Sequence, residues 1–206
     1  MHEPRVYLIG GPPGAGKTTL GCALAARIGG SSVTVDDLMT VAKTATTPQS
    51  HPDLYLCPPG HSIEYFTNST FDHLRATTDR QHEAVWPFVE SLIGKHFNWT
   101  TTSIVIDGWH LRPERIRAMN TDSVTACWIW IDPSVLEQRE RNNMDFYNQS
   151  RDPEKMFANF MARGAWFNDF IRDEAISHGF HVLEQDGSRS VKSLCEEVLE
   201  QQGRGA

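Results

Sequence analysis

Short apolar runs recur along the chain and alternate with stretches that have helical periodicity. The first run, residues 5–9, ends in Gly10-Gly11, which is typical of a buried strand followed by a turn. The expected strands are residues 5–9, 32–35, 103–106, 125–131 and 181–184.

The segments between these runs predict helices. Leu20, Leu24 and Ile28 lie one helical turn apart, so residues 17–28 are expected to form a helix that ends at Gly29-Gly30. Pro87 is expected to kink or break the long helix over residues 71–96. Strands separated by helices indicate an α/β fold, with a parallel sheet covered on both faces. The other expected helices are residues 113–119, 133–143 and 191–200, and one that begins after Asp152.

The helix after Asp152 carries a stripe of aromatic residues. Phe157, Phe160, Phe167 and Phe170 recur at three- and four-residue spacing along it. Such a stripe is typical of a helix face that packs into the core.

Residues 43–69 do not follow the alternating pattern. This stretch contains four prolines and Gly60 and has little periodicity, so we expect a long insert loop that caps the substrate. The length of 206 residues is consistent with one domain spanning residues 1–206.

Residues 11–18 fit the pattern G-x-x-x-x-G-K-[ST] between an expected strand and an expected helix. The glycines let backbone N–H groups turn toward a polyphosphate, and the positive end of the helix dipole points at the same place. Lys17 is expected to reach the β- and γ-phosphates, and the Thr18 hydroxyl to bind Mg²⁺. The expected cofactors are therefore ATP and Mg²⁺. The expected nucleotide-binding residues are Gly11, Pro12, Pro13, Gly14, Ala15, Gly16, Lys17, Thr18 and Thr19.

Acidic residues follow two of the expected strands, at the edge of the sheet where ligands bind in open α/β folds. Asp36 and Asp37 follow the second strand, and a carboxylate there can accept the proton of an acceptor hydroxyl. We expect Asp36 to be this base, while one of the pair could instead cap the next helix. Asp107 ends the third strand and is expected to hold Mg²⁺, or alternatively to initiate the turn at Gly108.

Three arginines flank a polar segment, residues 142–150. Arg139 and Arg141 precede it and Arg151 follows it, so residues 139–155 are expected to form a lid. A guanidinium offers planar donors to the charge that develops on a transferring phosphoryl group, so all three are candidate catalytic residues. The alternative is that they lie on a solvated surface.

A second basic cluster, Arg112, Arg115 and Arg117, comes shortly after Asp107. Its place near the expected acceptor site makes it a candidate for binding an anionic substrate. His110 adjoins the same site, and we expect it to be a hydrogen-bonding residue rather than a catalyst.

The charge and composition narrow the classes of function. Acidic residues outnumber basic ones by 26 to 19, and the resulting charge of −7 disfavours nucleic acid as a partner. The four cysteines form no C-x-x-C pair, which argues against a zinc site and a disulfide framework. No apolar run is long enough to cross a membrane and no secretory signal is expected, so the predicted location is the cytoplasm.

These motifs together resemble those of P-loop kinases that act on small acceptors. The similarity rests on residues 11–18, on Asp36-Asp37-Leu38, on residues 106–115 and on the arginines of the expected lid. The proteins it resembles are polynucleotide 5′-kinase-like, zeta-toxin-like and 2-phosphoglycerate-kinase-like. The resemblance implies a three-layer P-loop fold with five parallel strands and a lid.

The resemblance also implies roles for individual residues. Asp36 takes the position of the general base, Asp107 that of the acid near Mg²⁺, and Arg139 that of a lid arginine, with Arg141 or Arg151 as a second. Polynucleotide kinases have an arginine two residues after the Asp-Asp step, whereas this chain has Leu38-Met39 there. This departure disfavours a nucleic-acid 5′-hydroxyl as the acceptor.

The sequence therefore predicts an ATP-dependent kinase that phosphorylates a hydroxyl group of a small molecule. One alternative is a nucleotide or polynucleotide 5′-hydroxyl kinase, which would need a basic strip with stacking aromatics. Another is a nucleotide-dependent regulatory ATPase. A guanine-specific switch would carry N-K-x-D, and residues 142–145 lack its lysine.

Overall fold

Five parallel strands form one sheet in this computed structural model, which describes residues 6–57, 60–98, 102–119 and 124–204. Their order is β2-β3-β1-β4-β5, which confirms the predicted parallel sheet. The first expected strand began at Arg5, which lies outside the described residues. The strands are β1 (Val6–Gly10), β2 (Ser31–Thr34), β3 (Ile104–Asp107), β4 (Val124–Ile131) and β5 (His181–Gln185).

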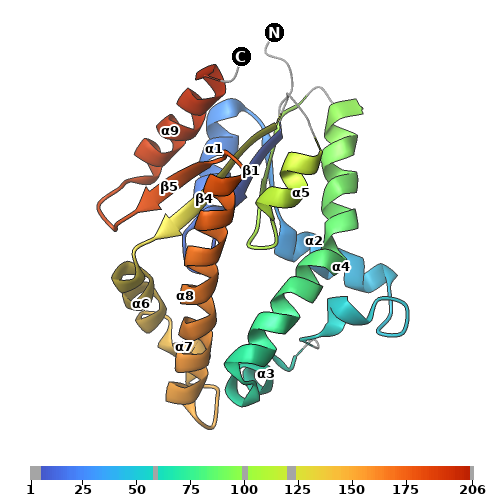
Figure 1. Cartoon of the computed structure of the whole chain (residues 1–206), viewed down its shortest axis with the longest axis vertical. Helices are drawn as coiled ribbons and strands as arrows, with labels where there is room; N and C mark the ends of the chain where they lie inside the picture. The colour runs from blue at the N-terminus through green and yellow to red at the C-terminus, as the bar shows by residue number, and fades with distance from the viewer. Residues whose placement is uncertain (1–5, 58–59, 99–101, 120–123, 205–206) are drawn as a thin grey trace.

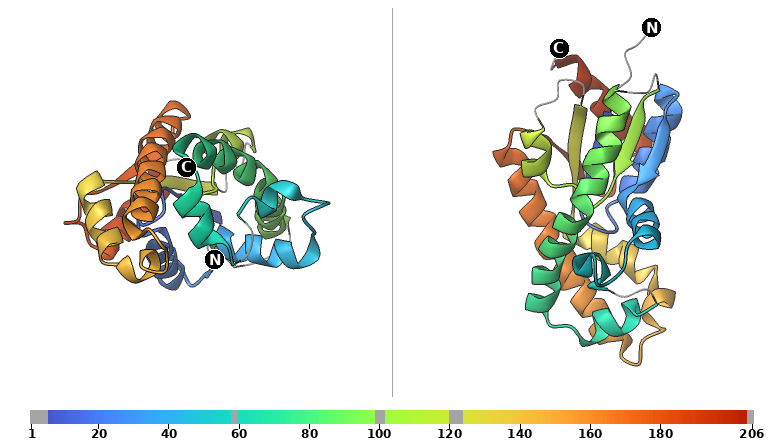
Figure 2. Two further views of the ribbon diagram at one scale, coloured as in Figure 1. Left: turned by 90° about the horizontal axis from the view of Figure 1, so that it is seen from below. Right: turned by 90° about the vertical axis from the view of Figure 1, so that its right-hand side faces the viewer.

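Helices cover both faces of this sheet, as the alternation of elements predicted (Figures 1 and 2). Those N-terminal to β3 are α1 (Lys17–Ile28), α2 (Val35–Ala45), the 3₁₀ turn η1 (Pro52–Tyr55), α3 (Ser62–Asn68) and α4 (Phe71–Asn98). Those that follow β3 are α5 (Pro113–Ala118), α6 (Pro133–Arg141), α7 (Met144–Tyr147), α8 (Pro153–Ser177) and α9 (Val191–Arg204).

The side chains of β1 show how the two layers of helices are held. Val6 and Leu8 pack into an apolar cluster with residues of α4, α5 and α8. Tyr7 and Ile9 point to the other face and pack with α1 and α9. This alternation follows from the two-residue period of a strand, and it makes β1 the centre of the three-layer fold.

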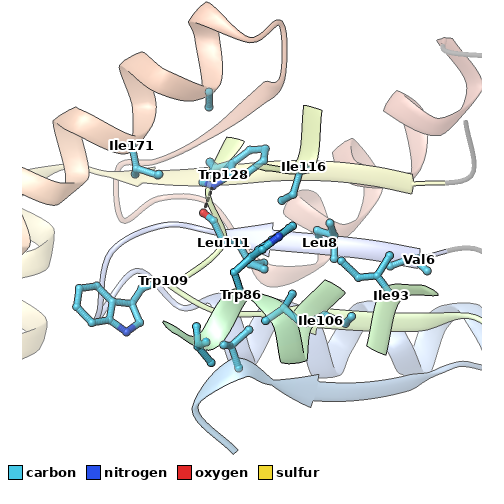
Figure 3. Packing of buried hydrophobic residues seen from close by; sticks show 14 of the residues in the cluster. Val6, Leu8, Trp86, Ile93, Ile106, Trp109, Leu111, Ile116, Trp128 and Ile171 are labelled. Atoms are coloured by element: carbon cyan, nitrogen blue, oxygen red, sulfur yellow. Dashed lines mark hydrogen bonds between the residues drawn. The ribbon is translucent and has the colours of Figure 1, made fainter. Parts of the chain in front are cut away.

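Trp128 of β4 fixes the loop that follows β3. Its ring is fully buried, and its Nε1 donates a hydrogen bond of 3.0 Å to the carbonyl oxygen of Leu111 (Figure 3). Gly10 makes room for this ring, because a Cβ atom at Gly10 would lie 2.1 Å from Nε1 of Trp128. The loop that carries Trp109 and His110 is therefore anchored to the core.

Pro87 bends α4 without ending it. The helix has 28 residues in all and continues beyond this proline. Figure 1 shows its two halves meeting at an angle. The missing N–H group and the bulk of the proline ring account for such a bend. Of the two outcomes predicted for Pro87, the structure has the kink.

Two segments expected to lack regular structure contain short helices. Residues 43–69 hold the end of α2, the turn η1 and α3, so the prediction of a structureless loop there was wrong. Tertiary contacts provide the order that periodicity did not reveal, since Leu54 is fully buried and Asn159 of α8 donates to the carbonyl oxygens of Phe66 and Ser69. Residues 142–150 likewise contain α7, whose Tyr147 is fully buried.

The expected boundaries of the other elements were close to those observed. Asp107 is the last residue of β3, as predicted, and the C-terminal helix extends to Arg204. In the part of the chain that the structure describes, no helix is both long and apolar enough to span a membrane.

Candidate active site

The turn between β1 and α1 has the geometry of a phosphate cradle. Gly11, Gly14 and Gly16 all have positive φ angles, of 132°, 78° and 93°, which side chains rarely allow. A Cβ atom at Gly11 would also lie 2.6 Å from the carbonyl oxygen of Ile129. The glycines therefore permit a tight turn whose backbone N–H groups lie at the start of α1, where an anion binds favourably.

Lys17 is the first residue of α1 and folds back over this turn. Its Nζ donates a hydrogen bond of 2.7 Å to the carbonyl oxygen of Pro12. Burial lowers the pKa of Lys17 to about 8, against the opposing effect of the Asp36 and Asp107 carboxylates. A bound polyphosphate would add negative charge beside this ammonium group and favour its charged form.

Thr18 and Asp107 lie together beside the cradle. The Thr18 hydroxyl donates a hydrogen bond of 2.8 Å to Oδ1 of Asp107. Oδ2 of Asp107 is buried and has no hydrogen-bond partner among the described residues. Burial raises the pKa of this carboxyl group, as expected of an acid that lacks a full set of partners.

This pair fits a magnesium ion. Mg²⁺ prefers oxygen ligands and keeps several positions for water and phosphate oxygens, so one hydroxyl and one carboxylate are a sufficient protein contribution. No group of three or more His, Cys, Asp or Glu side chains suited to a metal occurs among the described residues. A metal ion bound by protein side chains alone would need more ligands than Thr18 and Asp107 provide.

Asp36 and Asp37 lie in the first turn of α2, and neither is its cap. Thr34 has that role, because its Oγ1 accepts a hydrogen bond of 3.0 Å from the backbone N–H of Asp37. The expectation that one aspartate caps the helix was therefore wrong. The strand ends one residue earlier than predicted, and a threonine caps as well as an aspartate.

Asp36 faces the cradle side of the site. Its Oδ1 lies 3.9 Å from Nδ1 of His110. Although 67% of the Asp36 side chain is exposed, desolvation by the surrounding protein raises the pKa of Asp36. The positive charge of Lys17 opposes this shift. A carboxylate with these surroundings can act as a base near neutral pH.

A cavity of about 270 Å³ opens beside Asp36 and Lys17. It is bounded by the cradle, α2, Cys57, α3, α4, the loop after β3 and α8. Figure 1 shows that α3 and the adjoining halves of α4 and α8 lie together beyond the carboxyl ends of the strands. The cavity is therefore at the edge of the sheet where ligands bind in open α/β folds.

Arg163 of α8 lines this cavity, and the sequence reasoning missed it. Only 6% of the residue is exposed, and its guanidinium carbon lies 4.6 Å from the ring centres of both Phe66 and Trp109 and 5.5 Å from that of Phe160. Burial lowers its pKa to about 10. The signal was present, because a residue three after Phe160 and four before Phe167 lies on the same helix face as the aromatic stripe.

Two histidines lie behind the site. His82 and His110 are both buried, their ring centres are 4.9 Å apart, and no ring nitrogen of either has a hydrogen-bond partner among the described residues. Burial lowers the pKa of His110 to about 3 and that of His82 well below its ordinary value. The hydrogen bonds expected of His110 are thus absent among the described residues, and burial favours the neutral form of both rings.

Comparisons with known proteins agree with this geometry at the level of the fold. No protein-family model matches the sequence, and no curated protein matches it. The shikimate kinase from Bacteroides thetaiotaomicron has a similar structure, with a TM-score of 0.53 and 16% identity over 97% of this chain and 98% of that chain. The chain has the fold of a P-loop kinase.

Two further solved structures show the same likeness. The shikimate kinase from Acinetobacter baumannii, in complex with shikimate, has a TM-score of 0.51 and 16% identity over 97% of this chain and 92% of that one. The protein TT1252 from Thermus thermophilus has a TM-score of 0.53 and 17% identity over 97% of this chain and 98% of its own. At such identities the similarity establishes the P-loop kinase fold alone.

Of the three candidate lid arginines, the structure brings Arg139 to the cradle. Its Nη1 donates a hydrogen bond of 3.1 Å to the carbonyl oxygen of Gly14. Arg141 instead pairs with Glu137 one helical turn away and stacks on the ring of Phe157. Arg151 lines a separate hollow between α3 and residues 149–151.

The segment between these arginines is anchored beside the cradle. The Tyr147 hydroxyl donates a hydrogen bond of 2.7 Å to Oε2 of Glu140. The other oxygen of Glu140 lies against Gly14, 2.6 Å from where a Cβ atom there would be. Within the expected lid, α7 is therefore a short helix that Glu140 holds beside the cradle.

The basic cluster after Asp107 is directed away from the cavity. Arg112 forms ion pairs with Asp79 and Glu174, and Arg115 forms one with Glu83. None of the three arginines of the cluster lines the cavity beside Asp36. Carboxylates from α4 and α8 thus already occupy Arg112 and Arg115.

Proposed function

We propose that this protein is a Mg²⁺-dependent kinase that transfers the γ-phosphoryl group of ATP to a hydroxyl group of a small molecule. One observation carries the proposal: Lys17 of the cradle and the carboxylate Asp36 line the same cavity. The phosphoryl donor and a proton acceptor are then available on either side of the space that an acceptor would fill.

The cradle and Lys17 hold the β- and γ-phosphates in this proposal, and Thr18 and Asp107 hold the metal. When bound there, Mg²⁺ neutralises charge on the phosphate oxygens. Asp36 accepts a hydrogen bond from the acceptor hydroxyl, orients its oxygen toward the γ-phosphorus and takes its proton. The new bond joins the acceptor oxygen to phosphorus, and the bond between phosphorus and the β,γ-bridging oxygen breaks to release ADP.

Arg139 stabilises the charge that develops during the transfer. It already reaches the cradle through Gly14, and a guanidinium needs only a side-chain rotation to turn its other donors toward a phosphate. Residues 139–155 form the lid in this proposal, and Arg141 and Arg151 contribute only if the lid closes further. Asp37 remains a candidate for orienting the nucleotide or the metal.

The volume of the cavity supports a small acceptor. A volume of about 270 Å³ lies just below the range of ~300–1,000 Å³ that is typical of small-molecule pockets. The net charge of −7 also disfavours nucleic acid. The small-acceptor kinases that the motifs resemble, including the zeta-toxin-like and 2-phosphoglycerate-kinase-like groups, agree with this choice.

The test is a panel of hydroxyl compounds incubated with labelled ATP, with phosphorylated products identified by mass spectrometry. We expect one compound or a small chemical group of them to gain a phosphoryl group. Lys17→Ala should abolish the product, while the exposed Lys192, far from the cradle in sequence, provides a matched Lys→Ala control. ATP hydrolysis that yields no phosphorylated compound and is unaffected by Asp36→Asn would instead support a regulatory ATPase.

A further inference from the structure

Arg163 is a buried cation that no carboxylate pairs with directly, although the charge of Asp36, which lines the same cavity, acts on it. It makes no hydrogen bond and no ion pair with any described residue, and its Nε is fully buried. Buried charges in proteins are normally paired, because leaving one uncompensated is costly. By contrast, Arg112, Arg172 and Arg189 each pair with a carboxylate although all three are more exposed than Arg163.

The surrounding rings do not provide the missing partner. Phe66, Trp109 and Phe160 interact with the guanidinium through their π faces. Such contacts satisfy the charge in part but offer no acceptor for the N–H groups, which lie in the plane of the guanidinium. The rings thus hold Arg163 in place. Its N–H groups can donate to an oxyanion that lies in the plane of the guanidinium.

Lys43 brings a second positive charge to the same cavity. It lies on α2 seven residues after Asp36, and both side chains line the cavity. The Nζ atom of Lys43 is 5.7 Å from the ring centre of Tyr55. With Lys17 assigned to the cradle, the cavity wall has two further cations and one carboxylate, Asp36. This local positive charge occurs in a chain whose net charge is −7.

We propose that Arg163, assisted by Lys43, is an anion subsite for the acceptor, so that the acceptor carries a carboxylate or phosphate group in addition to its hydroxyl. This inference rests on the proposed function for the identity of the ligand as an acceptor. The anionic group lies in the plane of the Arg163 guanidinium, the aromatic rings contact the carbon skeleton, and the hydroxyl is directed to Asp36.

A structural role for Arg163 makes a different prediction. If the guanidinium served only to hold the three rings together, replacing it with methionine would destabilise the protein. If it serves a ligand, Arg163→Met removes an unpaired buried charge and fills the same space with an apolar side chain. The melting temperature should then stay constant or rise, while anion binding is lost.

Binding is tested with defined probes and needs no turnover. Benzoate and phenyl phosphate represent the two anionic groups, and benzyl alcohol is their neutral counterpart of similar shape. Titrations followed by calorimetry are done with Mg²⁺ and ADP present, so that the cradle is filled. We expect the wild-type protein to bind one of the anions at least ~10-fold more tightly than benzyl alcohol, as one charge-assisted contact provides.

Four variants test whether Arg163 and Lys43 are the cause of the preference for the anion. Arg163→Met should abolish the preference for the anion, and Arg163→Lys should retain part of it. Lys43→Gln provides a second variant that leaves α8 unchanged and should weaken the preference. Arg172→Met on the exposed side of α8 is the matched control and should bind like the wild-type protein.

Three outcomes would overturn the proposal: equal binding of anions and alcohol by the wild-type protein, no binding of either anion, or a preference that survives in Arg163→Met. The relative affinities for benzoate and phenyl phosphate identify which group the subsite prefers. A protein that binds anions through Arg163 but phosphorylates nothing would refute the proposed function and leave the subsite intact. The experiments can therefore refute the anion subsite and the proposed function separately.

Discussion

Mild acid should destabilise this protein through His82 and His110. Both rings are buried, and none of their nitrogens has a hydrogen-bond partner among the described residues. Burial, together with the positive charges of Lys17, Arg163 and Lys43, lowers the pKa of His110 to about 3 from its ordinary 6.5. The pKa of His82 is lowered well below 6.5, mainly by burial and by its neighbour His110. Both histidines therefore take up protons more readily in the unfolded chain.

The sign and size of the effect follow from this difference in pKa. As the pH falls below 6.5, the unfolded chain binds a proton at His110 that the folded protein does not bind. The stability contributed by the neutral ring is fully present above pH 6.5 and is lost progressively as the pH falls toward 3. At a pH of about 5 the loss is about 2 kcal/mol for His110, and His82 adds a loss in the same direction.

Two carboxyl groups of the site oppose this trend. Burial raises the pKa of Asp36 and of Asp107, so the folded protein takes up their protons at higher pH than the unfolded chain does. Acid favours the folded state through these two groups. The effect of His110 is therefore measured as the difference between the wild-type protein and His110→Leu, in which both carboxyl groups are kept.

The assay is urea unfolding at several pH values between about 7.5 and 5. The free energy of unfolding of the wild-type protein, relative to that of His110→Leu, should fall by about 2 kcal/mol over this range. The exposed His61 provides a matched control, and wild-type and His61→Leu curves should run parallel because this side chain faces solvent in both states. Parallel curves for wild-type and His110→Leu would refute the reasoning.

The remaining predictions concern catalysis, metal and packing. Asp36→Asn should lower turnover by about 10²–10⁴-fold with unchanged ATP affinity, because it keeps the shape of the base but removes its basicity; a large loss in Asp37→Asn with a normal Asp36→Asn would exchange the two roles. Removing Mg²⁺ with a chelator should abolish turnover, and activity that persists would exclude Asp107 as a metal ligand. Gly108→Ala should destabilise the protein by about 1–3 kcal/mol in chemical unfolding, because its Cβ would lie 2.6 Å from the Cβ of Val35. An unchanged unfolding free energy would show that this strand–helix contact adapts.

The architecture was predictable because each part of it depends on local patterns. Five apolar runs became the five strands, and the helical periods between them became the helices on both faces. The errors concern segments whose order comes from distant contacts. Leu54 and Tyr147 are buried in elements of only four residues, which are too short to show a periodic signal along the chain.

The candidate site was predictable only in part, for the same reason. The cradle is a contiguous motif, and the structure places Thr18 and Asp107 together because β1 and β3 are neighbours in the sheet. The capping residue of α2 was mistaken because Thr34 and the two aspartates are all good caps, and only the backbone conformation at Thr34 decides between them. The cavity could not be predicted, since its walls come from seven separate segments.

Arg163 shows where local rules fail and why that failure is informative. The spacing of Phe160 and Phe167 assigns the face between them to the core, and position 163 on that face should then be apolar. An arginine there is unfavourable for the fold alone, because rings surround its guanidinium and no carboxylate pairs with it directly. Conflicts between a residue and its structural context are expected mainly at functional sites. A charge within an apolar helical stripe, on a helix that follows a candidate lid, is therefore a sequence signal for an acceptor-binding residue.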